Sequence, residues 1–300
     1  MVHQASGQFD FVDSWLGNNP KLNQRLDNLV GLVDWKPFEL NLAPIYSSPS
    51  GRPSHPVLML VMCLLLQTWY NLSDYALEEA LDDRLSFRRF VGLSVSEKAP
   101  DHSVFSRFRD QLIKRRIHEM LFHELERQLK NRGLIVKKGT LVDATVIEAA
   151  PKKPNQNIDG TAGKSRIDSE ADWTKKGGKY LFGYKAHMGV DQDSKLIRRI
   201  AMTPAHVHDG EMLEQVVSGD EDWVFADKAY DSAKNHQILG KVNINNGILM
   251  KGTRKRKLSR VENMCNRILS KLRCPVEHIF GTLKRSYHYT RGRYLGLKKN

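Results

Sequence analysis

The stretch "LVDATVIEAA", residues 141–150, reads as a β-strand that carries a carboxylate within an apolar run. Leu141, Val142 and Ile147 suit a buried strand, whereas Asp143 is an acid among them. An unpaired charge in a protein interior costs several kcal/mol. We therefore expect Asp143 either to have a compensating partner or to serve a function that requires a carboxylate at this place.

Before this stretch, up to about residue 136, the periodicity is helical. The run "VLMLVMCLLL", residues 57–66, is apolar on all sides but only about half as long as a membrane span, so it predicts a core helix. Ser73 suits the N-cap of the next helix. Asp101 or Ser103 can cap a later helical segment, which Gly133 ends. This part of the chain predicts an all-α domain.

From residue 139 the chain shows strand-like runs bounded by Gly, Asp and Pro. With the helical stretches between them, the runs follow the order β-β-β-α-β-α-β-α. Three strands that can form a meander, followed by alternating helices and strands, predict a mixed sheet flanked by helices. This is the order of the RNase H-like (retroviral-integrase-type) fold, of mixed α+β and α/β class. We predict a helical domain over residues 1–136 and an RNase H-like domain over residues 137–300.

A second acid lies in "DWVFADKAY", residues 222–230. If this segment is a strand, Trp223, Phe225 and Asp227 alternate onto one face. Asp227 then falls near the C-terminal end of the strand, where open α/β sheets place their ligand sites.

A third acid, Glu277, lies in the helical stretch 262–285. Lys284 follows it seven residues later and therefore shares its face. Arg273, four residues before Glu277, points roughly the same way. Pro275 leaves two alternatives open, because it can kink this helix or begin a new one.

Three carboxylates repel one another, so their convergence makes sense if a divalent cation lies among them. Ligands that are all oxygen select hard ions such as Mg²⁺ or Mn²⁺. Two such ions about 4 Å apart can activate a water or a 3′-hydroxyl and stabilise the leaving oxygen of a phosphodiester. We predict Asp143, Asp227 and Glu277 as catalytic residues that bind two such ions.

The chain is strongly basic, with 47 Lys and Arg against 34 Asp and Glu, a net charge of +13 and a pI near 9.6. Such a balance is typical of proteins that bind a polyanion, most commonly nucleic acid. The three cysteines lack metal-ligand spacing and indicate a reducing compartment. Without a signal-like N-terminus or a membrane span, the sequence predicts a cytoplasmic protein that has no membrane partner.

The basic residues cluster in segments that predict contacts with double-stranded DNA. The segment "KGTRKRKLSR", residues 251–260, has six Lys or Arg and no acid, and is either a phosphate-gripping loop or a solvated linker. Residues 150–185 read as a long loop with lysines beside aromatic residues. Residues 102–116 resemble a recognition helix. With two residues near Glu277, the predicted DNA contacts are Arg107, Arg109, Lys175, Lys176, Arg254, Lys255, Arg256, Lys257, Arg273 and Lys284.

Three motifs carry a resemblance to a known family: "LVDATVIEA", "VFADKAYDS" and "RCPVEHIFGTLKR". They resemble the catalytic motifs of DDE transposases of bacterial insertion sequences, of the insertion-sequence-five family within the insertion-sequence-four-like superfamily. The resemblance runs over nearly the whole chain from about residue 50. It implies that Asp143, Asp227 and Glu277 form the metal-binding triad. Arg273 and Lys284 fit the superfamily signature around Glu277, whose Tyr position is Ser270 here.

The resemblance implies a transposase that binds terminal inverted repeats, hydrolyses phosphodiesters at the element ends and joins the 3′-hydroxyls to target DNA. It also implies a homodimer in the DNA complex and a place at the bacterial nucleoid. Two alternatives stay open. One is a metal-dependent nuclease of the same fold that only cuts. The other is a truncated or domesticated copy that binds DNA without catalysis, as a repressor does.

Overall fold

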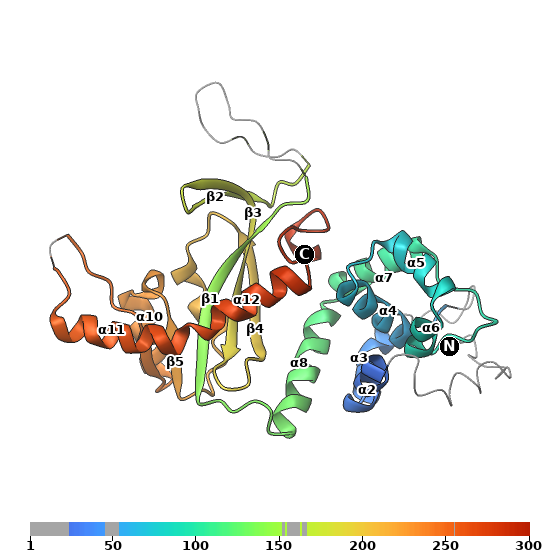
Figure 1. The fold of residues 1–300 in the computed structure, drawn as a ribbon, viewed down its shortest axis with the longest axis horizontal. Helices are drawn as coiled ribbons and strands as arrows, with labels where there is room; N and C mark the ends of the chain where they lie inside the picture. Colours follow the sequence, from blue (N-terminus) through green and yellow to red (C-terminus); the bar gives the residue numbers. More distant parts are fainter. Residues whose placement is uncertain (1–23, 46–53, 152–153, 155–162, 164–166, 255) are drawn as a thin grey trace. The chain divides into compact units, whose positions relative to one another are not determined.

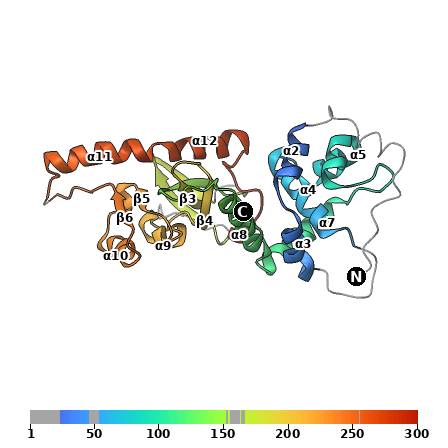
Figure 2. The ribbon, with the colours of Figure 1, turned by 90° about the horizontal axis from the view of Figure 1, so that it is seen from below.

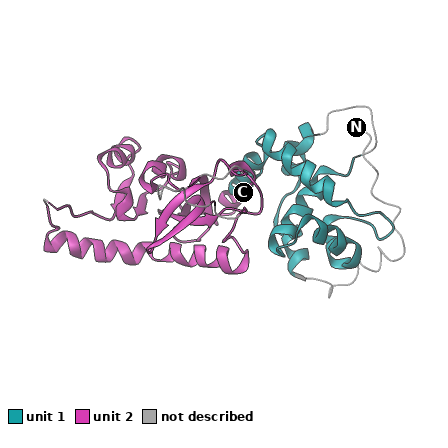
Figure 3. Ribbon diagram, turned by 90° about the horizontal axis from the view of Figure 1, so that it is seen from above, with its two compact units in different colours: residues 1–128 teal, residues 129–300 magenta. Residues whose placement is uncertain are grey.

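The structure is a computed structural model, and it describes residues 24–45, 54–151, 154, 163, 167–254 and 256–300. The chain forms two compact units, Met1–Gln128 and Leu129–Asn300 (Figure 3). The division falls inside the last helix of the first unit, α8 (Ile117–Asn131). The predicted division at 136/137 falls just beyond that helix, before the first strand.

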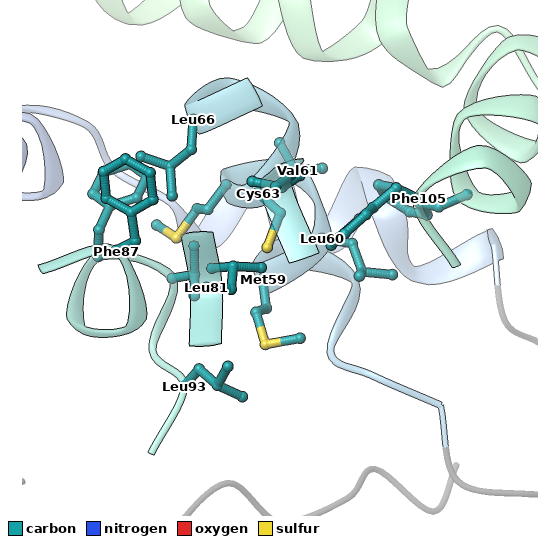
Figure 4. Close-up of a cluster of buried hydrophobic side chains, with 14 of the residues drawn as sticks. Met59, Leu60, Val61, Cys63, Leu66, Leu81, Phe87, Leu93 and Phe105 are labelled. Carbon is teal, nitrogen blue, oxygen red and sulfur yellow. The ribbon is translucent and has the colours of Figure 1, made fainter. Parts of the chain in front are cut away.

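The first unit is helical, as the periodicity predicts. Its core is built around one helix, α4, whose Met59, Leu60, Cys63 and Leu66 are buried among side chains from neighbouring helices, including Phe105 (Figure 4). This burial confirms the predicted core helix. The unit comprises α2 (Gln24–Leu32), α3 (Lys36–Leu42), η1 (Ala43–Ile45), α4 (Val57–Trp69), α5 (Asp74–Asp83), α6 (Leu85–Val91), α7 (His102–Lys114) and most of α8.

In the part of the chain that the structure describes, no single helix is long and apolar enough to cross a membrane. Helices α4 and α5 pass that test only as a pair, and they are bent by 106° to each other.

Side-chain caps start two of these helices where the sequence places them. Ser73 accepts a hydrogen bond from the backbone of Ala76, and Asp101 accepts one from the backbone of Val104. The helical segment that follows Asp101 is broken, however, into α7 and α8. Arg116 adopts a φ of 56° between them, a left-handed conformation that a right-handed helix excludes. The sequence alone did not show this break.

The second unit is built on a mixed six-stranded sheet (Figure 1). The strands run in the order β2-β3-β1-β5-β6, and β4 pairs with β3. The pairs β1–β5 and β5–β6 are parallel, whereas β1–β3, β2–β3 and β3–β4 are antiparallel. The predicted mixed sheet is therefore present. Its strands are β1 (Gly139–Glu148), β2 (Asp172–Lys176), β3 (Lys179–Asp191), β4 (Ile197–Pro204), β5 (Trp223–Ala226) and β6 (Asn245–Ile248).

Helices cover both faces of this sheet (Figure 2). On one face, Val142 and Val224 pack against Leu239 and its neighbours in α9 and α10. On the other, Leu141 packs in a cluster with Phe280 of α12. The elements outside the sheet are η2 (Asp209–Met212), α9 (Leu213–Val216), η3 (Lys228–Tyr230), α10 (Ala233–Lys241), α11 (Arg260–Arg273), α12 (Pro275–Ser286) and η4 (Leu297–Lys299).

The segment 150–185, expected to be a loop, contains the edge strand β2 and the start of β3. The turn between them uses Gly177 and Gly178, with φ of 57° and 79°, values that glycine adopts without strain. Trp173 packs on Phe182 across the strands, with ring centroids 5.4 Å apart. Cross-strand pairs of this kind stabilise a hairpin. Lys175 and Lys176 therefore lie on a strand, and expecting a loop throughout was wrong.

Candidate active site

Asp143 lies in the middle of β1 and Asp227 lies directly after β5, at the point where the parallel pairing of these two strands ends. Val142 of β1 is the register partner of Ala226, the last residue of β5, and each acid follows directly. Val142 and Ala226 point to the same face of the sheet. Because side chains alternate along a strand, the side chains of both acids point to the opposite face. They therefore lie on the side of the sheet covered by α12, where the pairing of β1 with β5 ends.

Glu277 comes to the same side of the sheet from the helices that cover it. Helix α11 ends at Arg273, and Pro275 is the first residue of α12, so Pro275 begins a new helix. Its fixed φ and missing N–H suit that position. Glu277 lies in the first turn of α12, near the positive end of the helix dipole. Val276 and Phe280 beside it are buried against the sheet and fix the rotation of the helix.

Arg273 connects two of the three acids. Its Nη1 lies 2.8 Å from Asp143 Oδ2, and its Nη2 lies 3.2 Å from Glu277 Oε1. The Arg273 side chain is 15% exposed and that of Glu277 is 63% exposed. One guanidinium thus stands between a strand carboxylate and a helix carboxylate, and the partner expected for Asp143 is Arg273.

Burial raises the pKa of Asp143 above its ordinary value. The positive charge of Arg273 and hydrogen bonds from Ala144 and Arg273 oppose this change, while the negative charge of Asp227 adds to it. Asp143 and Asp227 are therefore close enough to repel each other, and Asp143 is stabilised as an anion only in part.

The carboxylate oxygens of Asp143, Asp227 and Glu277 are the ligands that a hard divalent cation prefers. The negative charge of Asp143 is only partly neutralised, which favours binding of such a cation. In this respect the residues fit a metal site. Within the described ranges, however, no three acidic, His or Cys side chains are gathered closely enough to hold an ion together. The three acids lie on the same side of the sheet, and Arg273 lies between Asp143 and Glu277.

A second group of polar side chains, which the sequence analysis did not single out, lies beside the acids. Lys185 Nζ lies 2.9 Å from Asp209 Oδ1 and donates to the carbonyl of Val207 at 2.8 Å. Tyr230 is 1% exposed, and its hydroxyl finds no hydrogen-bond partner among the described residues. Burial raises the pKa of Tyr230, as do the negative charges of Asp209, Asp143 and Asp227.

The loops that carry Asp209 and Tyr230 are tied together. Asn235 is buried, and its Nδ2 donates to the carbonyls of Gly210 and Tyr230, both at 2.8 Å. A Cβ at Gly210 would lie 2.5 Å from the carbonyl oxygen of Ala229, so only glycine permits this approach. The segment that follows Asp227 is thereby fixed against the segment that follows β4.

Comparison with known families adds to this geometry. The family model described as transposase DDE domain matches residues 135–300, which span the whole sheet and all three acids. The chain belongs to the DDE transposase family. A second family model, described as transposase domain (DUF772), matches residues 14–111, in the helical unit. No solved structure matches the chain.

The protein is therefore a transposase, an enzyme that acts on DNA in transposition and recombination. Members of the DDE family generally use divalent metal ions. The mixed sheet flanked by helices is consistent with the RNase H-like fold.

Several predicted DNA contacts of this transposase lie on its surface. Lys284 Nζ donates to the carbonyl of Val146 near the end of β1 at 3.4 Å, and burial lowers the pKa of Lys284, with a smaller effect from the charge of Lys176. Arg254, Arg256 and Lys257 are exposed between β6 and α11, where Arg256 pairs with Glu262. Lys255 lies outside the described residues.

The two predicted DNA contacts in the helical unit of the transposase differ in their exposure. Arg107 is exposed, and its Nε donates to the carbonyl of Ser103 at 3.2 Å, within the same helix. Arg109 is buried, with Nη2 2.7 Å from Asp74 Oδ1 and 3.0 Å from Gln67 Oε1. Its guanidinium is used inside the protein, so placing Arg109 in a DNA groove was wrong.

Proposed function

We propose that this transposase cuts phosphodiesters at the ends of its element and joins the 3′-hydroxyls to target DNA, with Asp143, Asp227 and Glu277 as metal-binding catalytic residues. One observation supports this most directly: Asp143 and Asp227 directly follow a register pair of the parallel strands β1 and β5, and Arg273 links Asp143 to the acid of α12. The proposal includes an RNase H-like fold and a place in the insertion-sequence-five family.

Two bound Mg²⁺ or Mn²⁺ ions would supply an activated water or 3′-hydroxyl and would stabilise the leaving oxygen. The contribution of the protein is to hold the side chains of the acids in fixed positions. Asp143 is held on a strand with buried neighbours, and its Oδ1 accepts a hydrogen bond from the backbone of Ala144 at 2.8 Å. Asp227 Oδ1 accepts from the backbone of Lys228 at 2.7 Å. Side chains fixed in this way would lose little freedom when they bind the metal ions.

The basic residues would hold the DNA. Lys284 and Lys176 stand near the end of β1, and the exposed residues Arg254, Arg256 and Lys257 form a second group before α11. Contacts from such side chains to phosphates position a duplex without reading its sequence. We assign recognition of the inverted repeats to the helical unit, through exposed residues of α7 such as Arg107. We expect a homodimer on paired ends, in the cytoplasm at the nucleoid.

The test is an assay with labelled DNA that carries the element's ends, once intact and once pre-cut, in Mg²⁺. The wild-type protein should cut the intact ends and join the pre-cut ends. Asp143→Asn should abolish both reactions and keep DNA binding. Asp193→Asn, which removes an exposed acid in a turn of the same unit, should preserve both reactions.

Other outcomes identify the alternatives. Cutting by the wild type without joining of pre-cut ends would identify a nuclease. Binding without either reaction would identify a DNA-binding protein that has no catalytic activity, and full activity of Asp143→Asn would overturn the proposed site.

A further inference from the structure

The position of Arg273 has a consequence for metal binding. Its guanidinium contacts Asp143 Oδ2 at 2.8 Å and Glu277 Oε1 at 3.2 Å, so it already uses an oxygen of two of the three proposed metal ligands. A carboxylate oxygen that accepts a charge-assisted hydrogen bond is a poorer ligand for a cation. A guanidinium and a divalent ion at the same oxygens also repel each other strongly, because the site is partly shielded from water.

The present arrangement also leaves the ligand set incomplete. No three acidic, His or Cys side chains form a ready metal cluster in the part of the chain that is described. Glu277 is 63% exposed, and the only ion pair that the described residues give it is with Arg273. For Glu277 to give Oε1 to an ion shared with Asp143 and Asp227, this oxygen has to give up its ion pair with Arg273.

Arg273 has donor capacity that its present contacts do not use. Its Nε is buried and has no hydrogen-bond partner among the described residues. A guanidinium presents five N–H donors in a fixed fork that matches the oxygens of a phosphate. A buried donor that lacks an acceptor is costly, so the side chain gains if it finds one.

We propose that Arg273 is a built-in counter-ion of the metal site, which occupies it without metal and is displaced when a divalent cation binds. Its departure frees Glu277 to complete the ligand set. The released guanidinium then takes a DNA phosphate, so that metal loading and DNA engagement are coupled. This inference rests on the proposed function, since it assumes that the three acids are the metal ligands.

The experiment measures Mn²⁺ binding to the full chain without DNA, by isothermal titration calorimetry, and compares the wild type with Arg273→Gln. Removing the competing cation should tighten Mn²⁺ binding on the order of tenfold, which is typical of coupled binding events. Arg273→Lys retains the charge and should tighten it much less. Arg285→Gln is the matched control, because Arg285 is an exposed arginine of α12 whose Nε donates to the carbonyl of Gly281 in its own helix. It should leave the affinity unchanged.

A second measurement covers DNA. Adding Ca²⁺, which can occupy such a site, should strengthen binding of the wild type to a pre-cut end, and Arg273→Gln should lose this enhancement. Unfolding curves in Mn²⁺ report binding independently, because a ligand of the folded state raises the unfolding midpoint.

The outcomes separate the two ideas. If the wild type binds Mn²⁺ through Asp143 and Arg273→Gln does not bind it more tightly, the counter-ion role is refuted and the proposed function stands. If neither protein binds Mn²⁺ by calorimetry or by a shift of the unfolding midpoint, the metal site itself is refuted, and both proposals fall.

Discussion

His187 makes the stability of the second unit depend on pH, and the size of the effect can be worked out. The side chain is fully buried on β3, where its Nε2 lies 2.8 Å from Thr203 Oγ1. Its Nδ1 has no hydrogen-bond partner within the described ranges. Burial lowers the pKa of His187 from 6.5 to about 4; the charge of Asp209 opposes the change and that of Lys185 adds to it.

The sign follows from proton binding. Between pH 6.5 and about 4, the unfolded chain binds a proton that the folded chain refuses, so the free energy of unfolding falls as the pH falls. The contribution is fully present above pH 6.5 and is lost progressively down to about pH 4. With ~1.4 kcal/mol per pH unit, the whole window corresponds to about 3 kcal/mol, of which about 2 kcal/mol is lost between pH 7 and pH 5.

The assay is hydrogen exchange resolved by peptide, in increasing urea at pH 7 and pH 5, which reads the opening of β3 separately from the helical unit. Other groups also titrate in this range, so the comparison protein is His187→Gln, which keeps a polar group but cannot be protonated there. The wild type should lose about 2 kcal/mol more than the variant on acidification. Equal losses in the two proteins would refute a neutral buried His187.

Two further predictions concern charged residues whose surroundings differ. Asp220 pairs with Arg198, which is fully buried, so Asp220→Ala removes a carboxylate partner from a buried charge; because Asp220 is itself 36% exposed, we expect a loss of about 2 kcal/mol in urea unfolding, against less than about 0.5 kcal/mol for the exposed neighbour Asp222→Ala. Arg109→Ala should cost the helical unit about 3 kcal/mol because Asp74 loses the arginine of its ion pair, whereas Arg107→Ala should leave stability unchanged and reduce the salt dependence of DNA binding by about one ion. A destabilised Arg107→Ala protein, or a stable Arg109→Ala protein, would contradict this division.

The pattern of apolar residues in the sequence was sufficient to predict the alternation of strands and helices. Strand-like runs of apolar residues and helical spacing predicted the mixed sheet, because strands buried on both faces leave short apolar runs and helices buried on one face leave a periodic signal. The new helix at Pro275 was one of two stated alternatives, since the ring removes one hydrogen bond but suits a first turn. The break at Arg116 left no such signal, because a positive φ at an arginine is imposed by the surrounding fold.

The candidate site could be predicted only where the chemistry is local. Asp143 stands out because a carboxylate in an apolar strand needs a reason. Arg109 looks like its neighbour Arg107 in the sequence, and only the fold brings Asp74 beside it. Tyr230, three residues after Asp227, looks like an ordinary core aromatic in the sequence. Only the fold brings Asp209 and Asp143 near it.

The separate start of α12 at Pro275 leaves the direction of Glu277 dependent on the lengths of both helical parts of this layer. An insertion into α11 would move Asn266 away from the backbone of Met250, with which it exchanges hydrogen bonds, or Arg273 away from Asp143. A single residue added between Pro275 and Glu277 would turn the acid by about 100° around its axis and point it away from the sheet. The stretch from Asn266 to Arg273 and the short junction after it are thus both fixed in length by their contacts.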